Sequence, residues 1–435
     1  MKRSITDKLL DWKNNRHRKP LILRGARQVG KTYSVIDFGK YYAGKVHIIN
    51  FEKTPKWKKI FEQDLDAIRI VSELELLLNE TIVPNNDLLF FDEIQNCPKA
   101  IMSLRYFYEQ LPEIHVIAAG SLLEFALTDI PFPVGRVQFI EMVPMSFAEY
   151  LMATGKDKMA EIINSTPVKL SEVIHQEILK QLFTYFFVGG LPEAVKCYAE
   201  EQKLSTVYKI YDDLMTTYIQ DFSKYSPRVD HDCLNMVLSS ISKSVGTQIK
   251  YARLADGFSN PTIKKAFQVL TMARLITKVK AASPAGLPLE ASSSEKKFKS
   301  IFLDIGLMAH LNGMNSNYFE LKQNFNAAFQ GALAEQFVGQ EFKASGQKNL
   351  YYWARNSKSS MAEVDYLLVK SNAVFPVEIK NSSSGRLKSV HLLLKEYPDC
   401  PKAIVLSHAE YGRIDNQKLE FIPIYYASQI SKQQN

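Results

Sequence analysis

One short segment of the sequence carries the residue types that bind phosphate groups. Residues 21–32 read LILRGARQVGKT, and the part from Gly25 to Thr32 fills every fixed position of the pattern G-x-x-x-x-G-K-[ST]. Its glycines let consecutive backbone N–H groups point inward, and the helix that follows adds its positive N-terminal end. We expect Lys31 to reach the β- and γ-phosphates of a nucleotide and Thr32 to hold Mg²⁺.

The residues expected to contact this nucleotide are Gly25, Ala26, Arg27, Gln28, Val29, Gly30, Lys31 and Thr32. The alternative is a glycine turn before an ordinary helix. An apolar strand in front of the turn and a helix over residues 33–42 behind it favour the phosphate loop.

A second segment supplies the acidic residues that a magnesium–nucleotide site needs. Residues 87–93 read DLLFFDE, and their four central apolar residues suit a strand that is buried on both faces of a parallel sheet. Asp92 and Glu93 follow at the carboxyl end, where such sheets bind ligands. We expect Asp92 to support the Mg²⁺ held by Thr32, and Glu93 to polarise the attacking water. The alternative is a strand that merely ends in acidic residues.

Strands and helices alternate around these two motifs. Hydrophobic patterning predicts strands at 21–24, 45–51, 88–91, 114–121 and 137–142, and helices at 5–12, 33–42, 56–80 and 101–110. One strand lies between the two motifs in sequence, which is the arrangement of the AAA+ and RecA-like division of P-loop ATPases. This order predicts an α/β domain with a parallel sheet.

Two further polar residues could act on the same phosphates. Ser121 follows a buried strand, where enzymes of this division resemble one another in using a polar sensor of the γ-phosphate; a plain strand-ending turn is the alternative. Arg136 lies in a loop and could neutralise charge in the transition state. Whether Arg136 acts in its own site, in that of a neighbouring copy or only at the surface stays open.

Six segments together resemble one protein family. They are GARQVGKT, LLFFDE, AAGSLL, the GR before a strand, MSFAEYL and VGGLPEAV. The combination is similar to a widespread bacterial and archaeal family of AAA-type ATPases whose C-terminal domain is catalogued as being of unknown function. The resemblance implies ATP binding, a helical lid, a winged helix and an end domain similar to restriction endonucleases.

Composition and charge set broad limits. The chain has 435 residues, of which 46% are hydrophobic and 23% charged, as in globular proteins. The four scattered cysteines form no metal-binding pattern, and no segment offers a membrane span or a signal peptide, so we expect a cytoplasmic protein. Residues 1–31 and 243–300 each carry a surplus of eight positive charges within a net charge of +8. This distribution favours a polyanionic partner; solvated helix faces are the alternative.

The second basic region has the pattern of a winged helix. Helices are expected at 234–243, 251–258 and 262–273, followed by strands at 275–279 and 299–303. Asn260 and Pro261 are expected to be the N-cap and first residue of the third helix, which would be the recognition helix. We expect it to bind double-stranded DNA, although winged helices also dock proteins.

The last segment contains a second set of residues that could do chemistry. Residues 363–370 and 373–380 are expected to form two antiparallel strands joined by a two-residue turn at Ser371-Asn372. In such a hairpin, two residues face each other across the strands when their residue numbers sum to 743. Asp365 would then face Glu378, and this like-charged pair calls for a cation such as Mg²⁺.

Lys380 projects from the same face as Glu378 and could orient a water or a phosphate. With Glu335 on a preceding helix, this set resembles the metal site of PD-(D/E)XK nucleases, which implies Mg²⁺-assisted phosphodiester hydrolysis. A degenerate site, and a solvent-facing Glu335, are the alternatives. Pro376 predicts an edge strand or a bulge.

These observations predict four parts in order. They are an AAA-type P-loop ATPase domain (1–144), a helical lid (145–228), a winged helix (229–311) and a nuclease-like α/β domain (312–435). The expected function is ATP hydrolysis coupled to action on DNA, with ATP and Mg²⁺ as ligands and a candidate nuclease site in the last domain. The alternative is an ATP-dependent switch whose C-terminal modules bind a protein partner, and assembly into a homo-oligomer stays open.

Overall fold

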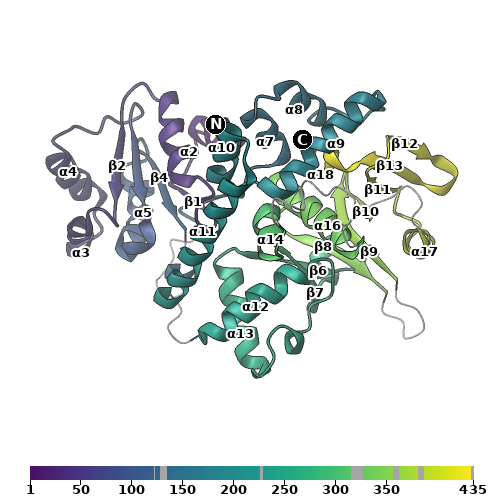
Figure 1. Cartoon of the computed structure of the whole chain (residues 1–435). Coiled ribbons are helices and arrows are strands. Elements are labelled where there is room, and N and C mark those ends of the chain that lie inside the picture. Colours follow the sequence, from purple (N-terminus) through teal and green to yellow (C-terminus); the bar gives the residue numbers. More distant parts are fainter. Residues whose placement is uncertain are drawn as a thin grey trace. The chain divides into compact units, whose positions relative to one another are not determined.

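The computed structural model describes residues 1–121, 123–127, 135–225, 229–314, 327–355, 362–380 and 387–432. The chain forms two compact units, and each is described by itself (Figure 1). The N-terminal unit comprises Lys2–Val143 and the short segment Met272–Arg274, and the C-terminal unit comprises Pro144–Thr271 and Leu275–Asn435, with Met1.

The N-terminal unit is built on a five-stranded sheet in which every pair of neighbouring strands is parallel. The strands are β1 (Leu21–Arg24), β2 (Val46–Asn50), β3 (Leu88–Asp92), β4 (His115–Gly120) and β5 (Gln138–Glu141). Their order across the sheet is β2-β3-β4-β1-β5. Because β4 lies between β1 and β3, the carboxyl ends of these three strands meet at one edge, and this confirms the predicted α/β class.

Helices cover both faces of this sheet. They are α1 (Ile5–Asn14), α2 (Lys31–Phe38), α3 (Ile60–Gln63), α4 (Ala67–Leu78), α5 (Pro98–Gln110) and α6 (Leu123–Leu127). Side chains of α3, α4 and α5, among them Phe61, Leu74 and Phe107, pack into one apolar core with Phe91 and other strand residues. On the other side α2 contacts β4, and α1 packs on α2.

The C-terminal unit combines a helical layer with one large sheet. Its helices are α7 (Phe147–Ala153), α8 (Asp157–Ile163), α9 (Glu172–Val188), α10 (Pro192–Glu201), α11 (Leu204–Tyr225), α12 (His231–Lys243), α13 (Asn260–Met272), α14 (Ile305–Leu311), α16 (Ala327–Ala344), α17 (Lys388–Glu396) and α18 (Ala427–Ser431). Its strands are β6 (Ile276–Ala281), β7 (Ser294–Phe302), β8 (Leu350–Ala354), β9 (Glu363–Lys370), β10 (Ala373–Lys380), β11 (Ala403–Ser407), β12 (Gly412–Ile414) and β13 (Leu419–Pro423).

These eight strands form one sheet in the order β12-β13-β11-β10-β9-β8-β6-β7 (Figure 1). The two strands expected to form a wing, β6 and β7, pair antiparallel, and β6 also pairs parallel with β8 from Val279 opposite Leu350. The expected domains 229–311 and 312–435 therefore share a sheet. The second expected helix of the winged region is reduced to a 3-10 turn at Tyr251–Arg253.

The hairpin of β9 and β10 has the predicted register. Ala373 pairs with Lys370 and Val377 with Tyr366, so facing positions sum to 743. Ser371 and Asn372 both have positive φ, 47° and 59°, as a two-residue hairpin turn requires.

The prediction that Pro376 marks an edge strand is wrong, because β10 lies between β9 and β11. Its pairing with β11 begins one residue later, at Val377, so the missing N–H of the proline falls outside that ladder.

The third helix of the winged region begins earlier than predicted. Ser259 Oγ accepts a hydrogen bond from Thr262 N, so Ser259 rather than Asn260 caps α13. As expected, one helix face is buried, with Ile263 and Phe267 in the core. Lys264 and Lys265 are exposed on the other face.

A buried carboxylate joins four helices of the C-terminal unit. Asp304 accepts hydrogen bonds from Gly190 N at 2.6 Å, from Leu307 N at 3.0 Å and from the Tyr211 hydroxyl at 3.2 Å. Burial raises the pKa of this carboxyl above its ordinary value. Gly189 has φ +67°, and a Cβ there would lie 2.1 Å from Asp304 Oδ1, so both backbone conformation and space require glycine. Packing around Asp304 thus explains the first glycine of the VGGLPEAV segment.

A second buried acid in this unit gives a pH-dependent test of stability. Glu341 accepts a hydrogen bond from Phe147 N at 2.8 Å, and burial raises the pKa of Glu341 to about 8. Between pH 4.5 and 8 the unfolded chain releases this proton and the folded chain keeps it, so stability contributed by this group falls as pH rises. We expect Glu341→Gln, whose amide oxygen can still accept, to exceed the wild-type Tm by about 5 °C at pH 8.

The gain should shrink toward pH 5, as measured by thermal unfolding at both pH values. Glu161→Gln, at an exposed position of α8, is the matched control and should change neither value. A gain for Glu341→Gln that is the same at pH 5 and pH 8 would contradict the assignment.

Candidate nucleotide site and carboxylate cluster

The predicted phosphate loop connects β1 to α2, and its two glycines have different roles. A Cβ on Gly25 would lie 2.3 Å from Met142 O, because the end of β5 passes directly over the loop. Gly30 has φ +89°, the left-handed region that favours glycine. Gln28 also has positive φ, at 60°. Gly25 is therefore required because the chain at the end of β5 leaves no room for a side chain. Gly30 is required because the turn into α2 needs a left-handed backbone conformation.

Lys31 lies across this loop. Its Nζ donates to Gly25 O at 3.0 Å and to Ala26 O at 2.7 Å, and the residue is 7% exposed. Burial lowers the pKa of Lys31 to about 8. The loop thus holds the ammonium group at the N-terminus of α2, where backbone N–H groups and the helix dipole also favour an anion.

Thr32 and Asp92 meet as predicted. Thr32 Oγ1 donates to Asp92 Oδ1 at 3.0 Å, and Asn50 Nδ2 donates to Asp92 Oδ2 at 2.9 Å. Burial raises the pKa of Asp92. A hydroxyl and a carboxylate beside a phosphate loop are the oxygen ligands that Mg²⁺ prefers, with phosphate and water oxygens completing the set, so these residues fit a magnesium–nucleotide site.

Glu93 takes an unusual backbone conformation at the same edge. Its φ is +52°, which is uncommon for a residue other than glycine and points to local strain at a functional position. Its carboxylate accepts a hydrogen bond from Gln95 Nε2, and burial raises the pKa of Glu93. A Cβ on Gly120 would lie 2.4 Å from Gln95 Oε1, so this glycine gives the glutamine room. Gln95 was not predicted from the sequence.

Ser121 follows β4 at the edge where β1 and β3 also end. Its side chain is 3% exposed, and its Oγ has no hydrogen-bond partner among the residues that the structure describes. A buried hydroxyl without a partner is costly in an ordinary turn. The position agrees with the sensor prediction, and the strand-ending turn stays the alternative.

Arg136 is not brought to the phosphate loop. It precedes β5, whereas the loop follows β1, and in a parallel pair these are opposite edges of the sheet. Its Nε lies 2.9 Å from Glu109 Oε1 at the end of α5, and it is exposed. Of the three alternatives for Arg136, this position argues against action in its own phosphate site, and the other two stay open.

Another arginine, Arg274, lies at the edge of the sheet where β5 ends, the same edge as the phosphate loop. Arg274 donates from Nε to Glu124 Oε1 at 3.0 Å and also pairs with Glu141 at the end of β5. Its positive charge contributes to lowering the pKa of Lys31, after burial and the charge of Arg27. The sequence did not point to Arg274, because nothing local links it to residues more than a hundred positions away.

Four acidic side chains gather in the C-terminal unit and are here named the carboxylate cluster. They are Glu335 on α16, Glu363 and Asp365 on β9, and Glu378 on β10. Three of them converge on Lys299 of β7, whose Nζ lies 2.9 Å from Glu335 Oε1 and 3.7 Å from Asp365 Oδ1 and also pairs with Glu363.

Neither Lys299 nor Glu363 was predicted from the sequence as part of this site. The solvent-facing alternative for Glu335 is wrong, since Glu335 is 7% exposed and bound to this lysine.

Asp365 and Glu378 form the other half of the cluster. Asp365 Oδ2 accepts a hydrogen bond from Ile379 N at 2.8 Å, which places it beside Glu378 as the register predicts. Glu378 Oε1 lies 2.6 Å from Lys380 Nζ, but the buried Oε2 has no hydrogen-bond partner among the described residues. Burial and then the charge of Asp365 raise the pKa of Glu378.

A buried carboxylate oxygen without a partner, next to a second carboxylate, fits a cation such as Mg²⁺. Only Asp365 and Glu378 are arranged in a way that suits a cation; the other carboxylates of the cluster are not. Within the described ranges, no group of three or more His, Cys, Asp or Glu side chains is arranged to hold a metal ion.

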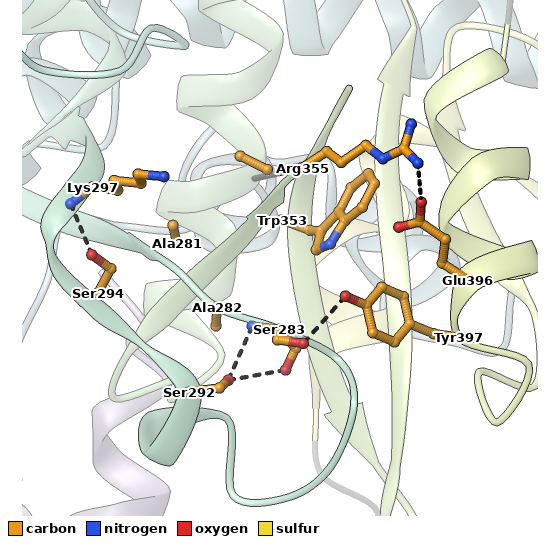
Figure 2. A pocket seen from close by; sticks show the side chains of 11 residues that line it. Ala281, Ala282, Ser283, Ser292, Ser294, Lys297, Trp353, Arg355, Glu396 and Tyr397 are labelled. Atoms are coloured by element: carbon orange, nitrogen blue, oxygen red, sulfur yellow. Dashed lines mark hydrogen bonds and ion pairs between the residues drawn. The ribbon is translucent and has the colours of Figure 1, made fainter. Parts of the chain in front are cut away.

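A hollow of about 290 Å³ lies near this sheet and apart from the cluster. Figure 2 shows Lys297 of β7 and Ser283 on one side and Trp353 of β8, Arg355 and Tyr397 on the other. Arg355 pairs with Glu396 at 2.8 Å. Serine hydroxyls and cations are side-chain types that contact phosphate groups.

Three family models match separate parts of the chain. Residues 17–151 match an AAA domain. Residues 179–318 and 330–426 match two domains of unknown function, DUF8612 and DUF4143. The parallel sheet of the N-terminal unit is consistent with the first match, so this part of the chain is similar to an AAA domain.

Solved structures give weaker likenesses over more of the chain. The Walker-type ATPase PABY2304 of Pyrococcus abyssi is 15% identical, with 71% of this chain and 94% of that chain covered and a TM-score of 0.44. The Orc1 protein of Aeropyrum pernix in complex with DNA is 11% identical, with 73% and 92% covered and a TM-score of 0.29. The RuvB Holliday junction branch migration motor of Thermotoga maritima is 15% identical, with 64% and 89% covered and a TM-score of 0.30.

TM-scores below 0.5 do not establish a common fold over these lengths. No curated protein matches the sequence. Among the described residues, no helix combines the length and the apolar character that crossing a membrane needs.

The contact between Gln95 and Glu93 predicts a selective kinetic defect. Replacement of Gln95 by Ala removes the side chain that orients the Glu93 carboxylate, so we expect kcat for ATP hydrolysis to fall about tenfold. ATP affinity should stay within about twofold, because Gln95 does not lie on the phosphate loop. Steady-state turnover and equilibrium nucleotide binding measure the two quantities. Asn96→Ala is the neighbouring control, and a Gln95→Ala variant with unchanged kcat would contradict the role.

Proposed function

We propose that this protein binds and hydrolyses ATP with Mg²⁺ and uses the nucleotide cycle to control its binding to double-stranded DNA. The observation that carries the ATP part is the contact between Thr32 Oγ1 and Asp92 beside the buried ammonium group of Lys31. Lys31 would neutralise charge on the β- and γ-phosphates, and Glu93 would accept a proton from the attacking water. Mg²⁺ would be held by Thr32 and Asp92 and would withdraw charge from the phosphate oxygens.

Charge on the C-terminal unit supports the DNA part. Lys264 and Lys265 are exposed on α13, and Lys296 and Lys297 are exposed on β7. A helix whose buried face holds it to its domain and whose exposed face is basic suits the major groove. The polar hollow beside Lys297 adds serine hydroxyl groups that would contact the phosphates of the DNA backbone (Figure 2).

The test is steady-state ATP turnover with Mg²⁺, with and without duplex DNA. We expect duplex DNA to raise turnover at least about threefold, and Lys31→Ala to show no turnover under either condition. The variant Lys264→Ala/Lys265→Ala should keep basal turnover, lose the stimulation, and reduce the salt slope of DNA binding by about two. Lys158→Ala/Lys196→Ala removes two other exposed lysines and is the matched control.

Two outcomes would argue against this proposal. Absence of ATP turnover in the wild-type protein would reject the ATPase part. Turnover that is indifferent to DNA, together with no salt-sensitive DNA binding, would favour the alternative, a nucleotide-dependent switch whose C-terminal modules bind a protein partner.

A second candidate activity is phosphodiester hydrolysis at Asp365 and Glu378. The observation that favours it is the buried Oε2 of Glu378, which has no hydrogen-bond partner among the described residues. These two carboxylates would hold Mg²⁺, which supplies Lewis-acid activation of the phosphate. Lys380, 2.6 Å from Glu378, would orient a water or a phosphate oxygen.

Substitution of Glu378 by Gln should abolish metal-dependent DNA cleavage and leave ATP turnover intact. The amide keeps the shape of the side chain but cannot supply the second negative charge to a cation. Cleavage of a labelled duplex is measured with Mg²⁺ and with EDTA. Asp399→Asn, at an exposed position just after α17, is the control. Cleavage that persists in Glu378→Gln would place the activity elsewhere or in a contaminant.

A further inference from the structure

The hollow beside Lys297 has a lining of two chemical kinds. Its volume of about 290 Å³ is at the lower end of the range for ligand pockets, which suits a ligand of about one nucleotide's size. Hydroxyl and cationic side chains form one part of the lining, namely those of Ser283, Ser292, Ser294, Lys297 and Arg355. Apolar and aromatic side chains form another part, namely those of Ala282, Trp353 and Tyr397. Such a lining fits a ligand that carries both an anionic group and a ring.

The cationic side chains of the hollow favour an anion. Arg355 Nη2 lies 2.8 Å from Glu396 Oε1. A guanidinium group has five N–H donors, so it can contact a phosphate while it keeps this carboxylate. Lys297 adds a second cation, and Figure 2 shows its side chain extending from β7 toward the strand that carries Arg355. The lining therefore holds two cations and one carboxylate, an excess of one positive charge.

The segment that joins β6 to β7 brings hydroxyl groups to the same place. Ser294 Oγ accepts hydrogen bonds from Lys296 N at 3.3 Å and from Lys297 N at 3.1 Å, and these contacts leave its own O–H as a donor. Ser292 holds the segment in shape, because its Oγ accepts from Ser283 N and donates to Ser283 O, both at 3.0 Å. Hydroxyl donors of this kind commonly contact phosphate oxygens.

Two aromatic rings meet at the apolar part of the lining. The ring centroids of Trp353 and Tyr397 lie 6.3 Å apart, with an angle of 84° between the ring planes. Trp353 is buried in an apolar core that also includes Ala282, whereas Tyr397 is only partly buried at the edge of that core. Nucleic acid bases stack on exposed aromatic rings, and an aromatic ring beside cationic groups is typical of sites that bind single strands.

A paired nucleotide cannot use both parts of this lining, because its base is stacked inside the double helix while its phosphate lies outside. We propose that the hollow binds one unpaired nucleotide of a DNA strand. Its phosphate contacts Lys297, Arg355 and Ser294, and its base packs against Tyr397. This inference deepens the proposed function and rests on its DNA part, since it makes the place where a duplex meets a single strand the preferred DNA structure.

The test compares a blunt duplex with the same duplex carrying a short overhang of unpaired thymidines. Fluorescence anisotropy with the full chain at fixed salt measures both Kd values. We expect the wild-type protein to bind the overhang duplex about tenfold more tightly. In Lys297→Gln and in Tyr397→Leu the ratio of the two Kd values should fall to about two or less. Lys296→Gln is the matched control, because it removes the same charge from the neighbouring position of β7 outside the hollow, and it should keep the ratio.

The failure of this inference is distinguishable from the failure of the proposed function. Equal affinity for the two duplexes, or a preference that survives in Lys297→Gln, overturns the inference and leaves duplex binding as proposed. If neither duplex binds, the DNA part of the proposed function fails, and a single-stranded oligothymidine becomes the probe. Binding of this oligonucleotide that Lys297→Gln loses and Lys296→Gln keeps supports the inference, and absence of binding overturns it.

A free nucleotide carries the same chemistry as a nucleotide within a strand, so a second arm separates the two sources. Binding of thymidine 5′-monophosphate is measured with Lys31→Ala, in which the phosphate loop lacks its ammonium group. Binding of the free nucleotide, together with equal affinity for the two duplexes, would assign the hollow to free nucleotides and overturn its assignment to DNA. An overhang preference that free nucleotide does not compete away supports the assignment to a DNA strand.

Discussion

The C-terminal unit depends on one buried carboxylate, that of Asp304. It caps α14, accepts from the backbone at the break between α9 and α10, and bonds to Tyr211 of α11. Gln340 of α16 lies 3.4 Å away and donates to the same group. Because these partners come from separate helices, loss of the carboxylate would leave several buried donors unpaired at once, which costs far more than one hydrogen bond. Gly189 lets this carboxylate approach the backbone, whereas Gly190 makes room for Met145 O, which a Cβ there would meet at 2.1 Å.

The parts of the structure that follow from local pattern were predictable from the sequence. The phosphate loop and its acidic partner are short patterns, so Lys31, Thr32 and Asp92 could be grouped from the sequence alone, and the structure brings them together. The hairpin register followed from its two-residue turn. In each case the residues that meet are close in sequence, or the pairing of strands in a sheet determines which of them lie side by side.

The main omissions, Lys299 and Arg274, have a common physical cause. Lys299 meets Glu335 and Glu363 across three elements, and no periodicity in the sequence links such distant positions. Arg274 was missed for the same reason. For Arg136 the sequence did hold a clue. A residue that precedes a strand of a parallel sheet lies at the edge opposite the phosphate loop, and this rule alone argues against action in its own site. The single sheet of β6–β13 could not be foreseen because strand pairing across long connections leaves little trace in one sequence.

The shared sheet limits where the chain could be divided into separate fragments. Strands β6 and β7 lie within residues 179–318, which match one family model, and β8 to β13 lie within residues 330–426, which match another. Even so, β6 and β8 are hydrogen-bonded neighbours. A gene rearrangement that separated the two families would expose an unpaired strand edge on each fragment, and such edges promote aggregation. The two segments therefore depend on each other for a complete sheet, and dividing the chain between them should yield two aggregation-prone fragments.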